Sequence, residues 1–130
     1  MTRMTPDKGQ ARSIIEAATA EMRTTLSLEQ TLEMAPLLLR SVYECFRSIG
    51  NALLMNEGIR EMDHVPQIER VIKLPAQTPR PLLLLDNLRR LRHDINYRGH
   101  KPTQAELDEF MDFAHKCWKP VLEEAKKTVG

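Results

Sequence analysis

Apolar residues recur every three to four positions along most of the chain, which is the spacing of one face of an α-helix. Alternation with a period of two, which would indicate strands, is scarce. The pattern predicts helices over residues 7–23, 36–57, 64–73, 82–96 and 103–127. We therefore expect a single domain over residues 1–130, folded as an all-α, antiparallel up-and-down bundle of four to five helices.

Residues typical of helix starts support these boundaries. Thr103 followed by Glu106 forms a capping box, which predicts the start of the last helix. Ser27 followed by Gln30 has the same spacing and favours a short helix in the otherwise uncertain segment 24–35. Pro120 should kink the last helix because it lacks a backbone donor. The other candidate N-caps are Thr5, Asp63 and Thr78.

The helix expected over 82–96 has a narrow apolar stripe formed by Leu84, Leu88, Leu91 and Ile95. Arg92 lies directly beside this stripe. If the leucines anchor the helix inward, the guanidinium of Arg92 is held at the lip of a groove rather than in open water.

The composition, with 42% hydrophobic and 28% charged residues, is that of an ordinary globular domain with one core. No apolar run approaches the ~18 residues of a membrane span, and the first ten residues lack a hydrophobic signal core. We therefore expect a cytoplasmic protein without membrane contact. Cys45 and Cys117 lie in apolar helical patterns and are interpreted as buried thiols in a reducing compartment, with a disulfide as the alternative.

The net charge is only +1, so any nucleic-acid footprint must be a local patch. Residues 88–101, LRRLRHDINYRGHK, are the only strongly basic stretch, and Asp94 is their single acid. Arg90 and Asp94 have the spacing of a helical ion pair. From charge alone, a solvated basic face is favoured over a phosphate-binding face.

Two segments resemble the HEPN family (higher eukaryotes and prokaryotes nucleotide-binding domains). They are LRRLRHDINYRG, at the end of the fourth helix, and VYECFRSIGNALLMNEG over 42–58, followed by His64. The resemblance covers about residues 35–127. It implies a helical bundle that often forms homodimers. Members include ribonucleases, toxins paired with nucleotidyltransferase antitoxins, and noncatalytic RNA- or nucleotide-binding proteins.

Catalytic HEPN members use an Arg, four to six intervening residues and then a His, and cleave RNA without a metal. In this chain Arg92 is followed by the polar His93, but Tyr97 stands where the His would be. None of the four histidines has an Arg at the required spacing before it; they are His64, His93, His100 and His115. Tyrosine has an ordinary pKa of about 10, against about 6.5 for histidine, and is a poor general base at neutral pH.

The resemblance and this departure together favour a noncatalytic RNA- or nucleotide-binding homodimer. Arg92, Asn96 and Tyr97 are expected to line its cleft, with Arg92 on phosphate. Arg89, Arg98 and His100 are expected to lie at the rim of this cleft.

Two alternatives stay open. The first is a metal-independent endoribonuclease of the toxin type, with Arg92, Tyr97 and His100 as catalytic candidates. The second is a helical interaction module that partners a nucleotidyltransferase. No cofactor is expected. No metal is expected either, because the Glu61–His64 and Asp112–His115 pairs lack the further inward carboxylates of a di-metal bundle site.

Overall fold

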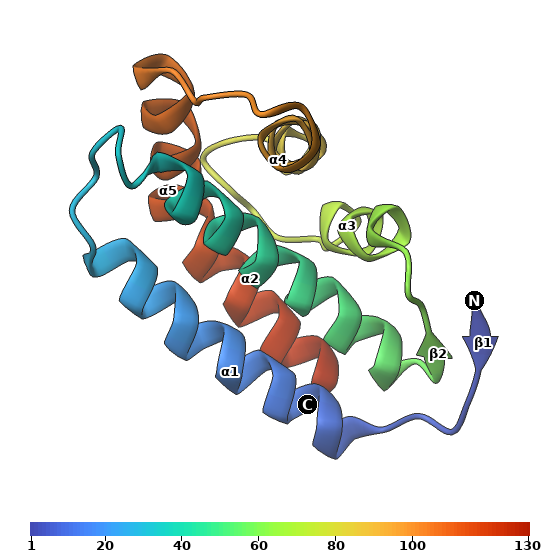
Figure 1. The fold of residues 1–130 in the computed structure, drawn as a ribbon. Helices are drawn as coiled ribbons and strands as arrows, with labels where there is room; N and C mark the ends of the chain where they lie inside the picture. The colour runs from blue at the N-terminus through green and yellow to red at the C-terminus, as the bar shows by residue number, and fades with distance from the viewer.

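The computed structural model describes residues 1–130 and confirms an all-helical bundle. Three long helices, α1 (Lys8–Ser27), α2 (Ala35–Asn56) and α5 (Gln104–Val129), lie side by side (Figure 1). The shorter α3 (His64–Ile72) and α4 (Leu84–Arg98) cross them on the α2 side (Figure 1). None of the five helices is both long enough and apolar enough to cross a lipid bilayer.

A small antiparallel sheet, which the sequence pattern did not predict, joins the start of the chain to the turn after α2. Strand β1 (Thr2–Arg3) pairs with β2 (Ile59–Arg60), with Thr2 opposite Arg60. The amide of Met4 extends the pairing by donating to the carbonyl of Gly58 at 2.8 Å. Gly58 adopts φ +77°, a conformation that glycine takes without a Cβ penalty, and thereby allows the tight turn into β2.

Helix α2 is the centre of the core and contacts every other helix. Its Phe46 is fully buried and meets Phe113 and Trp118 of α5 edge to face, at centroid distances of 5.3 and 5.2 Å. Cys45 and Cys117 are both buried and free, which confirms the prediction of buried thiols.

Two predicted caps near α1 are wrong. Asp7, rather than Thr5, caps α1, because its carboxylate accepts from the amide of Gln10 at 2.9 Å. Ser27 ends α1 instead of starting a short helix, since its hydroxyl donates back to the carbonyl of Thr24 at 2.6 Å. A serine that bonds to the preceding turn is not available to cap a following one.

The start of α4 also differs from the prediction. Thr78 does not cap it, because its hydroxyl donates to the carbonyl of Arg80 at 2.6 Å and the helix begins at Leu84. Leu85 replaces the half-buried Leu84 in the buried stripe, whose other members Leu88, Leu91 and Ile95 are as predicted.

The remaining two caps follow the sequence more closely. The capping box of Thr103 and Glu106 at α5 is confirmed, and α5 continues through Pro120. Asp63 occupies the N-cap position of α3, but its side chain makes no capping hydrogen bond.

Candidate functional site

A groove of about 440 Å³ lies between α2 and α4. Arg92 and Asn96, which were expected to line a cleft, both lie in it. They come from the same face of α4 because they are four residues apart. The other lining residues are Glu21, Leu37, Arg40, Ser41 and Glu44.

Arg92 differs from the other arginines of α4 in its surroundings. Arg89 and Arg90 both pair with Asp86, and Arg98 pairs with Asp94. Arg92 is half-buried and forms no ion pair. Its guanidinium lies over the ring of Tyr43, with Cζ 5.5 Å from the ring centroid, so its position is fixed while its charge is not neutralised by a carboxylate.

The predicted ion pair between Arg90 and Asp94 is wrong. Arg90 turns toward the start of the helix and reaches Asp86 at 2.9 Å, whereas Asp94 pairs with Arg98 at 3.7 Å. Both observed pairs place the acid four residues before the base, which is the better orientation relative to the helix dipole.

The groove also contains charges of both signs. Nε of Arg40 donates to Oδ1 of Asn96 at 2.6 Å, which holds a second guanidinium beside the groove. The two acids have partners of their own: Glu44 pairs with Arg47, and Glu21 accepts from the Ser41 hydroxyl at 3.1 Å. The acids therefore reduce the positive potential of the groove without binding Arg92.

Four predicted site residues are not among those that line this groove. Arg89 is half-buried and pairs with Asp86. The side chain of Tyr97 is 70% exposed and contacts the exposed His93 with the two rings tilted, at a centroid distance of 4.8 Å. Arg98 is exposed beside Asp94. Nε2 of His100 lies 2.8 Å from Oε1 of Glu106, so this imidazole is bound to the capping box of α5. The structure thus brings together Arg92 and Asn96 in the groove and leaves the other four predicted residues outside it.

Sequence reasoning missed Tyr43, which contacts Arg92, and His64, which contacts Tyr43. Tyr43 of α2 is fully buried, and its hydroxyl lies 2.9 Å from Nδ1 of His64, the first residue of α3. Burial raises the pKa of Tyr43, and the nearby Arg92 and Arg47 oppose the rise only in part. Burial lowers the pKa of His64, and the same two arginines lower it further. The phenol and the imidazole are therefore both neutral at pH 7.

A polar network holds the start of α3 against α2. Arg47 donates to Oε1 of the buried Gln67 at 2.7 Å and also pairs with Glu44. Nε2 of Gln67 donates to the carbonyl of Glu61 at 2.7 Å. The position of His64, one turn before Gln67, is consequently fixed relative to Tyr43.

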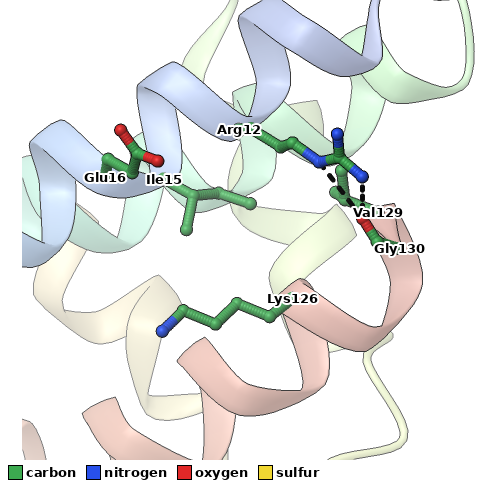
Figure 2. Close-up of a pocket in the computed structure, with 6 residues that line it drawn as sticks. All are labelled: Arg12, Ile15, Glu16, Lys126, Val129 and Gly130. Carbon is green, nitrogen blue, oxygen red and sulfur yellow. Dashed lines mark hydrogen bonds between the residues drawn. The ribbon is translucent and has the colours of Figure 1, made fainter.

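A second pocket, of about 250 Å³, lies between α1 and the end of α5 (Figure 2). Arg12 spans it and donates through Nε to the carbonyl of Gly130 at 3.1 Å (Figure 2). None of the predicted site residues lines this pocket. No three His, Cys, Asp or Glu side chains converge in a way that could hold a metal ion.

Comparisons with models of known protein families, with curated proteins and with solved structures found no significant match. The resemblance to HEPN domains therefore stays a prediction. The function has to be argued from the residues of the groove itself.

Proposed function

We propose that this chain is a HEPN-like, noncatalytic RNA- or nucleotide-binding protein that acts as a cytoplasmic homodimer and holds phosphate in the groove between α2 and α4. The observation that carries the proposal is the state of Arg92, which is half-buried, fixed over Tyr43 and free of any carboxylate partner. The homodimer rests on the resemblance alone, and sedimentation of the pure protein tests it.

The chemistry of a fixed guanidinium supports phosphate as the ligand. A guanidinium presents parallel N–H donors that match two phosphate oxygens. Because Tyr43 already restricts Arg92, less side-chain freedom is lost when an anion binds. Arg40 adds a second cation, and a groove of about 440 Å³ lies within the usual range for small-ligand sites of about 300–1,000 Å³.

Binding is favoured over cleavage because the residue at the family's His position offers little to proton transfer. Tyr97 is a phenol, and phenols are poor general bases at neutral pH. It is also 70% exposed and is not among the groove's lining residues. The ribonuclease remains the alternative that the same experiment distinguishes.

The test compares RNA binding by the wild type, Arg92→Ala and Arg90→Ala. Labelled, mixed-sequence single-stranded RNA is titrated in the presence of chelator, and binding is followed by fluorescence anisotropy. Arg90→Ala is the matched control, because it removes the same charge from the same helix at a side chain that is 69% exposed and paired with Asp86. A hydrogen bond to a charged group contributes about 1.5–3 kcal/mol, so Arg92→Ala should weaken binding ~10-fold or more. Arg90→Ala should weaken it far less.

Three results would contradict the proposal. If RNA does not bind even at low salt, the proposal is wrong. An equal loss for both variants would indicate a diffuse basic face, with no distinct groove. RNA cleavage in chelator, lost in Arg92→Ala, would establish the ribonuclease in its place. If the proposal is right, affinity also falls as salt is raised, because bound phosphates release counterions.

A further inference from the structure

We propose that His64 is the second arm of the phosphate site, so that one phosphoryl group is held between the Arg92 guanidinium and the Nε2–H of His64, with Tyr43 positioning both. The inference rests on the proposed function only for the presence of an anion at Arg92. It adds a binding residue from a different helix, and it predicts that binding is coupled to a proton.

Tyr43 is the structural link between the two arms. Cζ of Arg92, from α4, lies 5.5 Å from the centroid of the Tyr43 ring. The Tyr43 hydroxyl oxygen lies 2.9 Å from Nδ1 of His64, from α3. The phenol is fully buried, whereas Arg92 and His64 are only half-buried. The two arms therefore both contact Tyr43, and each remains partly accessible to solvent.

The direction of the Tyr43–His64 hydrogen bond follows from the partners that are present. The Tyr43 hydroxyl has no other hydrogen-bond partner, and no buried polar side-chain atom of the protein is left unsatisfied. Its O–H must then donate to Nδ1, since an accepting hydroxyl would bury an unpaired proton. The neutral imidazole consequently carries its own proton on Nε2, on the side of the ring away from Tyr43.

The charges around His64 favour an anion. Arg92 of α4 and Arg47 of α2 act against a positive charge on the imidazole, and Glu44 and Asp63 offset them only in part. An anion bound beside His64 and Arg92 removes this repulsion, so it should raise the pKa of His64. By linkage, binding then takes up a proton and strengthens as the pH falls toward that pKa. The added proton enters at Nδ1, so the Tyr43 hydroxyl then accepts from the imidazolium instead of donating to it. A phosphoryl group provides the negative charge and several acceptor oxygens that two arms require.

The test measures the pKa of His64 by NMR with labelled histidine, with sodium sulfate as the probe and sodium chloride at matched ionic strength as the control. Sulfate is a phosphoryl-like dianion that does not itself titrate in this pH range. The spectrum of His64→Gln assigns the signal, and the exposed His115, whose Nε2 lies 2.9 Å from Gln30, is the internal control.

We expect the free protein to show the Nε2–H tautomer and a pKa below about 6.5. Sulfate should raise the pKa of His64 and should lose this effect in Arg92→Ala. The NMR signal of His115 should not respond to sulfate.

RNA binding provides the second readout. His64→Gln and Tyr43→Phe should each weaken RNA binding several-fold, and His115→Gln should not. His64→Gln should also abolish the strengthening of RNA binding at low pH. Circular dichroism confirms that each variant is folded. If Tyr43→Phe does not fold, the half-buried His64→Gln still decides the outcome.

The outcomes separate this inference from the proposed function. If RNA binds and Arg92→Ala abolishes binding, but sulfate does not move His64 and His64→Gln binds normally, the second arm is refuted and the proposed function stands. If sulfate raises the pKa of His64 through Arg92 but RNA does not bind, the two-armed anion site is right and the RNA function is wrong. If neither ligand has an effect, both are wrong.

Discussion

A close approach of α2 to α3 depends on a glycine, and replacing this glycine should change the stability in a direction that can be worked out. Gly50 lies in the middle of α2 and is buried against α3. A Cβ at this position would lie 1.9 Å from the carbonyl oxygen of Gln67 and 2.7 Å from its carbonyl carbon. Both atoms belong to the backbone of α3, so no side-chain rotation can relieve the clash. Gly50→Ala must push α3 away from α2.

The size of the effect follows from that distance. Non-bonded heavy atoms are most stable at about 3.5–4.0 Å, so α3 would have to move by roughly 1.5 Å. Added atoms in a well-packed core cost about 1–3 kcal/mol, and a backbone neighbour places Gly50→Ala at the upper end of that range. Alanine recovers about 1 kcal/mol because it is the better helix former. We expect a net loss of about 2 kcal/mol in the free energy of unfolding.

Urea denaturation followed by circular dichroism measures this loss. For a small domain with a slope of about 1–3 kcal/mol per molar urea, the midpoint should fall by ~1 M with an unchanged slope. Gly9→Ala in the first turn of α1 is the control, because the nearest atom to its Cβ would be Oδ1 of Asp7 at an ordinary 3.7 Å. Gly9→Ala should match or exceed the wild type in stability. A Gly50→Ala protein that unfolds at the wild-type urea concentration would refute the close approach of α2 and α3.

Three further predictions concern local features. Thr103→Ala removes the N-cap hydrogen bond of α5 and should lower the free energy of unfolding by about 1 kcal/mol in urea titrations. Burial raises the pKa of both the Cys45 and Cys117 thiols, so a thiol reagent at neutral pH should label neither in the native protein and both in urea. The lowered pKa of His64 means that the unfolded chain binds its proton first as the pH drops below about 6.5. Stability should therefore decline below that pH, and decline less in His64→Gln, when urea midpoints are compared across pH.

The helices could be predicted because their signals are local, and the errors show where local signals fail. The box at Thr103 and the pair Ser27–Gln30 have the same spacing, yet only the first caps a helix, since the Ser27 hydroxyl bonds to the turn before it. Residues 82–85 are all leucine, so the sequence pattern does not show which of them faces the core. In the structure Leu85 belongs to the buried stripe of α4, and tertiary packing decides this. Strands of two residues, such as β1 and β2, are too short to show alternation at all.

In the candidate site, too, the residues placed by local helix geometry could be predicted and those placed by tertiary packing could not. Arg92 and Asn96 could be placed in a groove from the sequence because helical geometry alone puts them on one face of α4. The contact of Tyr43 with His64 could not be predicted from the sequence, because it depends on how α3 crosses α2. A tyrosine among apolar residues also looks like an ordinary core residue.

The contact between Tyr43 and His64 limits what can be concluded from the absence of the Arg–His motif. In this fold a histidine at position 97 would take the exposed place of Tyr97, outside the groove that Arg92 lines. The fold instead links the imidazole of His64, from α3, to Arg92 through the buried phenol of Tyr43, which both of them contact. Tyr97 in place of histidine therefore argues only against an Arg–His pair internal to α4. Whether an imidazole acts together with Arg92 depends on how α3 and α4 are placed around Tyr43, and the sulfate titration of His64 tests that directly.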